Sequence, residues 1–389
     1  MGAVGQDLAL AGLSAGDRVL VACSGGADSL ALAAALARHA GSVGRSTRKP
    51  GFRVTLGAVI VDHGLFAGSA QVAQQVAAQC RHLGLDFAQV CQVEVAQGAG
   101  SGGLEAAARH ARYQALDQAA AHHQAAAVYL GHTVDDQAEQ VLLSLARGSG
   151  TRALAGIAPV RGIYRRPLLG VGGQAGLGLR RADTLAACEH WGLDPWQDPS
   201  NAHQGAGAPL RNRVRHELLP VLHDVLGADA VVNLARSASI ARQDADALDA
   251  LAASLLDEAV IKELISDGPT SDGPTSDDPT AEEPISGESI CDTAMPECAC
   301  EPSHKPAPGE CFGGQVTCYR LDPLMQAAQA LRVRALKQAA WAHTGHAITS
   351  AHVDALNALT AKWQGQGPVF LPGGVQVTRE YGRLVFRTP

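Results

Sequence analysis

The chain has no long hydrophobic run. The longest, Leu30 to Ala37, falls well short of the roughly 18 apolar residues that a membrane-spanning helix needs. Its first ten residues lack a basic start followed by an apolar stretch, and position 6 has no serine or threonine that would signal myristoylation of Gly2. The sequence therefore predicts a cytoplasmic protein with no membrane partner.

Aromatic and charged residues are also few, at 4% and 18% of the 389 residues. Apolar residues nevertheless make up 46% of the chain, which is typical of a globular protein and excludes wholesale disorder. The length suits two or three domains and is sufficient for a sizeable core.

The negative charge is concentrated in one segment. The chain has 31 basic and 38 acidic residues, but residues 263–310 contain twelve of the acids and only one basic residue, Lys305. The remainder carries a net charge of +4, so the overall value of −7 does not exclude a nucleic-acid partner.

Short β-prone runs alternate with helical patterns through the first half of the chain. We expect strands at 17–23, 55–61, 87–95, 125–130 and 163–169, and helices at 29–40, 69–83, 104–121, 134–147 and 178–190. This alternation predicts an α/β fold, a doubly wound and mostly parallel sheet covered by helices on both faces. Such sheets bind ligands beyond the carboxyl ends of their strands.

The composition changes beyond this region. The expected parts are a first domain at 1–210, linker helices at 211–265, a flexible acidic insertion at 266–318 and a small α+β domain at 319–389. Residues 266–280 are three near-copies of a five-residue unit rich in Pro and Asp, which cannot bury enough apolar surface to become ordered. The small domain should contain helices at 331–344 and 352–363 and a closing hairpin.

The loop after the first expected strand reads Ser24-Gly25-Gly26-Ala27-Asp28-Ser29. Its glycines allow a ligand to approach the backbone, and the amides of the following helix start attract anions. The two serine hydroxyls can add donors, and Asp28 can hold a magnesium ion that bridges phosphates. The chain lacks the Gly-x-x-x-x-Gly-Lys-Ser/Thr loop of kinases and GTPases. An ordinary glycine–serine turn is the simpler alternative.

A second polar cluster follows the fourth expected strand, in the run Gly131-His-Thr-Val-Asp-Asp-Gln-Ala-Glu139. Asp135, Asp136 and Glu139 would share one side of a helix start, where the helix dipole by itself favours acids. Three acids with a histidine at a strand end are better explained as a site for a cationic or magnesium-bound ligand. Asp62 and His63 follow the second strand in the same way, so three strand ends are expected to meet at one crevice.

Arginines recur beyond the sheet. They are Arg161, Arg165, Arg166, Arg180, Arg181, Arg211, Arg213 and Arg215. Such runs commonly form solvated faces, but together they could also follow a phosphate backbone. A cysteine-rich stretch could bind zinc, although its spacing matches no standard motif; its ligands would be Cys298, Cys300, His304 and Cys311.

Taken in order, these motifs resemble the tRNA(Ile)-lysidine synthetase family of the PP-loop ATP pyrophosphatases. The first motif alone indicates only the superfamily, with its adenine nucleotide α-hydrolase-like fold. Further matching motifs are Glu105 to Tyr113, Arg147 to Gly150, Arg166 to Leu169, Asp198 to Asn201 and Arg211 to His216. Residues 320–387 resemble the family's small substrate-binding domain, and the chain is expected to be a short form without the extra C-terminal domain of longer members.

The resemblance implies an ATP-dependent ligase acting on tRNA(Ile) with a CAU anticodon. ATP would adenylate the 2-carbonyl oxygen of the wobble cytidine, and free L-lysine would then displace AMP to give lysidine, AMP and pyrophosphate. By this resemblance the catalytic residues are Asp28, Asp136, Glu139 and Arg112, and Asp28 also binds Mg2+. ATP would be bound by Ser24, Gly25, Gly26, Ala27, Asp28, Ser29, Asp62 and His63. Lysine would be bound by Asp136, Glu139 and Arg211, and the tRNA by Arg211, Arg213 and Arg215.

The chain departs from the family pattern at two positions: Phe66 stands where the family often has Arg, and Gln140 where Thr is common. Two other functions stay open. A PP-loop tRNA thiolase would need cysteines near the crevice, and Cys23 precedes the first motif without a Cys-x-x-Cys pair. A nucleotide- or tRNA-binding module would keep the fold without catalysis. The sequence also leaves the oligomeric state open, including a homodimer.

Overall fold

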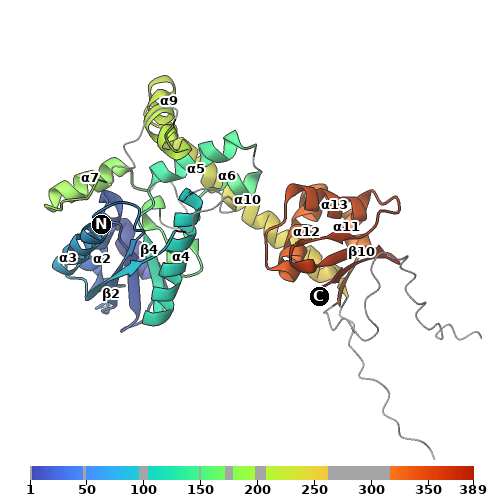
Figure 1. The fold of residues 1–389 in the computed structure, drawn as a ribbon, viewed down its shortest axis with the longest axis horizontal. Helices are drawn as coiled ribbons and strands as arrows, with labels where there is room; N and C mark the ends of the chain where they lie inside the picture. Colours follow the sequence, from blue (N-terminus) through green and yellow to red (C-terminus); the bar gives the residue numbers. More distant parts are fainter. Residues whose placement is uncertain are drawn as a thin grey trace, which may run out of the picture. The chain divides into compact units, whose positions relative to one another are not determined.

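The structure is a computed structural model. In it the chain forms two compact units, Met1–Ala247 and Leu248–Pro389 (Figure 1). The described residues are 2–46, 50–95, 104–148, 150–170, 178–197, 207–261 and 316–389. Nearly all of the acidic segment, including its four zinc-ligand candidates, lies outside these ranges.

The first unit is built on a six-stranded sheet with the order β3-β2-β1-β4-β6-β5. The strands are β1 (Arg18–Ala22), β2 (Thr55–Asp62), β3 (Phe87–Gln92), β4 (Ala125–Leu130), β5 (Val160–Arg161) and β6 (Tyr164–Arg165). All neighbouring pairs are parallel except β5 and β6. The predicted α/β class with a mostly parallel sheet is confirmed.

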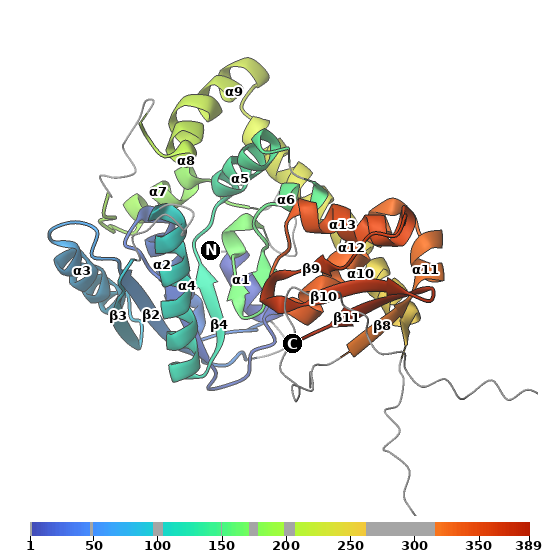
Figure 2. The same ribbon diagram turned by 45° about the vertical axis from the view of Figure 1, so that its right-hand side comes forward.

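Helices cover both faces of this sheet (Figure 2). One face is covered by α1 (Gly2–Leu10), α2 (Ala27–Ala40), α3 (Ser69–His82) and α7 (Arg181–His190). Val19 and Val21 of β1 pack against that layer, whereas Leu20 between them packs against α4 (Leu104–His123) on the other face. Because successive side chains of a strand point to opposite faces, this burial identifies β1 as a central strand with helices on both sides.

A group of helices follows the sheet. Its members are α5 (Val134–Ala146), α6 (Thr151–Leu154), α8 (Leu210–Arg213), the π-helical turn η5 (Val214–Leu218), α9 (Leu219–Leu226) and α10 (Ala230–Ala259). Val134 and Ala138 of α5 pack against Val214 and Leu219, so the segment 210–218, which carries Arg211, Arg213 and Arg215, is held against α5. No individual helix in the described ranges has the length and apolar composition of a membrane span; α8–α9 and α10 pass that test only as a pair bent by 100°.

The second unit is a small α+β domain, as predicted. Its five-stranded antiparallel sheet has the order β7-β8-β11-β10-β9. The strands are β7 (Val260–Ile261), β8 (Val316–Arg320), β9 (Val369–Phe370), β10 (Gln376–Glu380) and β11 (Arg383–Arg387). Its helices are α11 (Leu321–Gln326), α12 (Gln329–Thr344) and α13 (Ser350–Ala361). Leu336, Leu356 and Phe386 are fully buried between the two layers.

Several expected elements have different bounds. The strand expected at 163–169 is only the two-residue β6, followed by the 3-10 turn η1 (Pro167–Leu169), because a proline has no amide hydrogen to continue the ladder. The helix expected to reach residue 265 ends at Ala259, since β7 pairs with β8, a partner that comes much later in the chain. Helix α1, helix α11 and strand β8 were not predicted.

We expect Gly57→Ala to lower the free energy of unfolding by about 1–3 kcal/mol. Gly57 pairs with Phe87 of β3, and an added Cβ would lie 2.1 Å from Cζ of that ring. Gly41 is the matched control, because its φ is −81° and nothing lies within 4 Å of an added Cβ. Urea unfolding of both variants tests the difference, and equal midpoints would contradict the steric explanation.

Candidate active site

The predicted phosphate loop lies at the carboxyl end of β1 and leads into α2. Gly25 has a φ of +84°, and an added Cβ would lie 2.4 Å from Cγ2 of Val76, so only glycine fits there. The Ser29 hydroxyl closes the loop by accepting from the Ser24 amide (3.1 Å) and donating to the Gly26 carbonyl (3.0 Å). Gly26 caps α2 without a side-chain hydrogen bond, which leaves the helix start available to an anion.

Phe66 also lies beside this loop. Its ring stacks on that of Trp196 with the centroids 5.5 Å apart, and the Trp196 amide donates to the Gly25 carbonyl at 3.0 Å. The residue that stands in place of the family's arginine therefore packs against an aromatic side chain next to the phosphate loop.

The acidic helix start touches the phosphate loop directly. Strands β1 and β4 are adjacent and parallel, so both carboxyl ends lie at the same edge of the sheet. A Cβ added to Gly131 after β4 would lie 3.0 Å from the backbone carbonyl of Asp28. The absence of a side chain at Gly131 thus lets the two loops approach each other.

Asp136 uses its two carboxylate oxygens differently. Oδ2 accepts hydrogen bonds from the Thr133 amide (2.8 Å) and hydroxyl (3.1 Å), which caps α5. Oδ1 accepts from Nη2 of Arg181 (2.9 Å) and Nη2 of Arg215 (3.3 Å). Burial alone would raise the pKa of Asp136, but the nearby Arg181 and Arg215 charges and the Thr133 amide lower it below its ordinary value. The helix cap therefore holds Asp136 so that its other oxygen meets the guanidinium groups of Arg181 and Arg215.

Glu139, one turn further along α5, is completely buried. Arg215 of the π-helical turn η5 holds both of its oxygens, with Nε 2.7 Å from Oε1 and Nη2 3.1 Å from Oε2. This bidentate ion pair compensates a charge that could not otherwise be buried.

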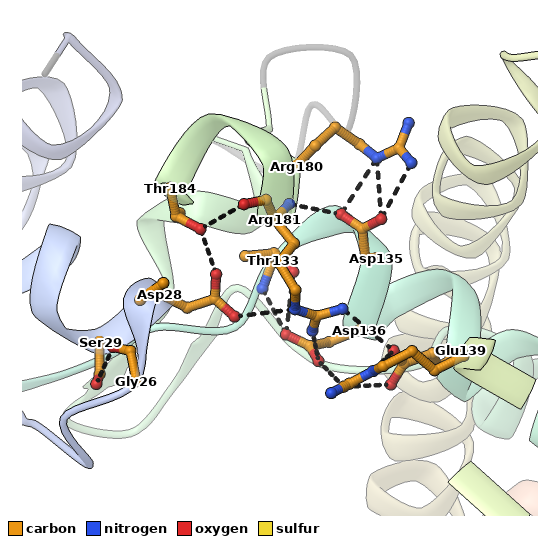
Figure 3. Close-up of polar contacts among 12 residues, drawn as sticks. Gly26, Asp28, Ser29, Thr133, Asp135, Asp136, Glu139, Arg180, Arg181 and Thr184 are labelled. Carbon is orange, nitrogen blue, oxygen red and sulfur yellow. Dashed lines mark hydrogen bonds and ion pairs between the residues drawn. The ribbon is translucent and has the colours of Figure 1, made fainter. Parts of the chain in front are cut away.

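Asp28 faces these acids from the start of α2. Its carboxylate accepts hydrogen bonds from the Thr184 hydroxyl and from Nε of Arg181, the latter at 3.3 Å. Burial raises the pKa of Asp28 and the Asp136 charge adds to the shift, although Thr184 and Arg181 oppose it. The Arg181 side chain thus lies between Asp28 and Asp136 (Figure 3).

Asp135 lies outside this group. Nε of Arg180 is 3.1 Å from each of its oxygens, and the Arg181 amide donates to Oδ2 at 2.8 Å. These bonds fasten the start of α7 to the start of α5. Of the three acids expected to share one face, Asp136 and Glu139 contact the guanidinium groups of Arg181 and Arg215, whereas Asp135 contacts the backbone amide of Arg181.

The remaining strand-end residues are one aspartate and two histidines. Asp62 is buried and accepts from the Gly64 amide (3.0 Å). Both ring nitrogens of His63 and Nδ1 of His132 are buried with no hydrogen-bond partner in the described parts of the chain. Burial lowers the pKa of both histidines, that of His132 to about 3, and the charge of Arg112 contributes to each shift. Arg112 itself is exposed and makes no ion pair with a described residue.

The three arginines expected to bind tRNA have different surroundings. Arg215 lies in the site on Glu139, while Nη2 of Arg211 donates to Gln140 Oε1 at 2.9 Å. Arg213 is exposed and pairs with Glu217 at 3.1 Å.

Sequence reasoning did not assign Arg181 or Thr184 to the site. Arg181 was one of several arginines in basic runs, and Thr184 lies on an unremarkable helical face. Both contact Asp28 from more than 150 positions away along the chain, and no local pattern indicates such a contact.

Parts of both units match known protein families. A family model described as a PP-loop domain matches residues 6–222, and one described as the TilS substrate binding domain matches residues 320–385. The tRNA(Ile)-lysidine synthase of Streptomyces coelicolor is 41% identical over 379 residues, covering 97% of this chain and 87% of the relative. That of Thermobifida fusca is 41% identical over 377 residues, covering 97% and 94%. That of Mycolicibacterium paratuberculosis is 49% identical over 247 residues, covering 64% and 67%.

We expect His132→Gln to reduce the loss of stability in acid. The pKa of His132 is lowered from 6.5 to about 3 in the folded protein, so between these values the unfolded chain binds more protons. The parent should therefore lose stability as the pH falls through this window, and the variant should lose less. Urea unfolding midpoints between pH 7 and pH 4 measure both slopes. The exposed His82→Gln is the control, and identical slopes for all three proteins would contradict the prediction.

Proposed function

Because the chain belongs to the tRNA(Ile)-lysidine synthase family, we propose that it ligates L-lysine to the wobble cytidine of tRNA(Ile) with a CAU anticodon. ATP adenylates the 2-carbonyl oxygen of the base and releases pyrophosphate. The ε-amine of lysine then attacks the 2-carbon and displaces AMP, which leaves lysidine. Activation is needed because a ring carbonyl oxygen is a very poor leaving group until it is esterified to phosphate.

One observation carries this proposal: an anion-binding helix start and three carboxylates lie within the reach of one guanidinium. Arg181 contacts Asp28 beside the phosphate loop and Asp136 and Glu139 on α5. The reaction needs a triphosphate next to a diamine, and the crevice offers amides for the first and carboxylates for the second.

The nucleotide is assigned to the first of these parts. The loop Ser24–Ser29 receives the phosphates, with Asp62 and His63 beside it at the end of β2. Asp28 would hold Mg2+, which usually takes only one or two protein carboxylates and completes its shell with phosphates and water. The described residues contain no group of three or more potential metal ligands, which fits an ion held partly by the substrate. When bound, the ion neutralises charge on the departing pyrophosphate.

Lysine is assigned to Asp136 and Glu139, whose carboxylates suit its amines. One of them takes a proton from the ε-ammonium group, because only the neutral amine is a nucleophile. Arg112 and Arg211 are assigned to a phosphate or the lysine carboxylate, and the bidentate pair with Arg215 holds the Glu139 carboxylate in position.

The tRNA is assigned to the basic surface and the small domain. Arg213 is exposed and suits a backbone phosphate. The second unit, which contains the match to the substrate binding domain, would grip the tRNA while the wobble base turns out into the crevice.

The two other functions have less support. Sulfur transfer would need an accessible cysteine near the phosphate loop, but Cys23, which directly precedes that loop, is buried. A non-catalytic module would not need Asp28, Asp136 and Glu139 arranged around one cation, and the absence of ATP–pyrophosphate exchange would favour it.

The test is incorporation of labelled lysine in the presence of ATP into transcripts of tRNA(Ile) and tRNA(Met), both with CAU anticodons. We expect label only in tRNA(Ile), and a loss of at least about 100-fold for Glu139→Gln and Asp28→Asn. Glu189→Gln, an exposed position on α7, is the control and should label like the parent. Circular dichroism must show that each variant is folded. Parental labelling by either site variant would remove that residue from its role.

A further inference from the structure

Arg181 occupies the centre of the site that the proposed function assigns to cations. Each nitrogen of its guanidinium faces a different carboxylate: Nε lies 3.3 Å from Asp28 Oδ2, Nη2 2.9 Å from Asp136 Oδ1, and Nη1 3.6 Å from Glu139 Oε1. A lysine ammonium group that binds Asp136 and Glu139 would compete for the same oxygens.

Arg215 also contacts these acids, but its contacts are of another kind. It grips both oxygens of the fully buried Glu139, at 2.7 and 3.1 Å. Such a fork-to-fork pair is strong and geometrically fixed. The contacts of Arg181 are single and spread over three acids. Arg181 is therefore the cation that can be exchanged.

The position of the Arg181 backbone allows such an exchange without movement of α7. Its amide donates to Oδ2 of Asp135 at 2.8 Å, which fixes the main chain at the start of the helix. Only the flexible side chain has to turn. The Asp28 contact already places the guanidinium beside the phosphate loop, and guanidinium groups bind phosphates well.

We propose that Arg181 is an internal cation that occupies the lysine site until bound ATP draws it towards the phosphates. Before nucleotide binds, Arg181 and Arg215 together compensate Asp28, Asp136 and Glu139 and leave little negative charge to attract lysine. Transfer of Arg181 to the triphosphate removes the shorter of the two guanidinium contacts to Asp136 Oδ1, leaving that from Arg215 at 3.3 Å, and it removes the Arg181 contact to Glu139. Lysine binding therefore depends on the nucleotide, and the two ligands are positively coupled. The inference rests on the proposed function, because it takes these acids as the lysine site.

The experiment measures binding of labelled lysine to the full chain with and without magnesium and an ATP analogue that has a methylene group between the α and β phosphorus atoms. For the parent we expect lysine to bind at least about fivefold more tightly with the analogue, within the usual range of allosteric coupling. For Arg181→Gln we expect the affinity without nucleotide to rise by a similar factor and the dependence on the analogue to be largely lost.

Two variants are the controls. Arg180→Gln removes a neighbouring charge whose one ion-pair partner in the described parts of the chain is Asp135, so it should keep both the parental lysine affinity and the coupling. Arg181→Lys keeps the positive charge and should continue to exclude lysine when nucleotide is absent. A purely structural role for Arg181 would weaken lysine binding in both Arg181 variants.

The outcomes separate this inference from the proposed function. If Arg181→Gln leaves lysine binding unchanged or weakens it, while Glu139→Gln abolishes it, the inference is overturned and the assignment of the lysine site stands. Equal affinity of the parent with and without the analogue would also overturn it, even if Arg181→Gln did not fold. Failure of the parent to bind lysine under any condition, together with failure to label tRNA(Ile), would instead refute the proposed function.

Discussion

Charge compensation at the carboxyl ends of β1 and β4 is the constraint on which the site depends. Removing a carboxylate from water costs several kcal/mol unless a partner compensates it, and Glu139 has no exposed surface at all. Arg215 compensates Glu139 from η5, while Arg181 links Asp136 to Asp28 from α7. The acids can therefore gather at one place without any bound ligand.

The fold supplies this arrangement through the order of its strands. Because β1 and β4 are neighbours, the two loops that follow them emerge side by side at one edge of the sheet. Gly131 then lets the β4 loop contact the backbone of Asp28, where any side chain would keep the loops apart. The glycine-rich start of α2 and the acidic start of α5 consequently lie side by side. The Asp136 cap uses the dipole of α5 and still leaves one oxygen to accept from Arg181 and Arg215.

Local patterns were sufficient to predict the parallel sheet, the phosphate loop and the acids at the start of α5, because hydrophobic periodicity and loop composition act over a few residues. They could not predict the partners of those acids. Arg180 and Arg181 are adjacent and chemically identical in sequence, yet one fastens α7 to Asp135 and the other enters the site. Strand β7 escaped prediction for the same reason, since its pairing with β8 depends on a distant segment. Long-range contacts of this kind are set by packing, which a single sequence does not reveal.

In the segment 210–218, packing gives three arginines close in sequence different surroundings. Arg211 and Arg215 are one helical turn apart and both face α5, where they contact the consecutive residues Gln140 and Glu139. Arg213 lies between them in sequence, points to the opposite side and stays exposed. A π-helical turn begins directly after it, and such turns occur often at functional sites because they change the direction of the side chains that follow. One short segment thus provides a half-buried counter-ion for the acids on one side and an exposed arginine on the other.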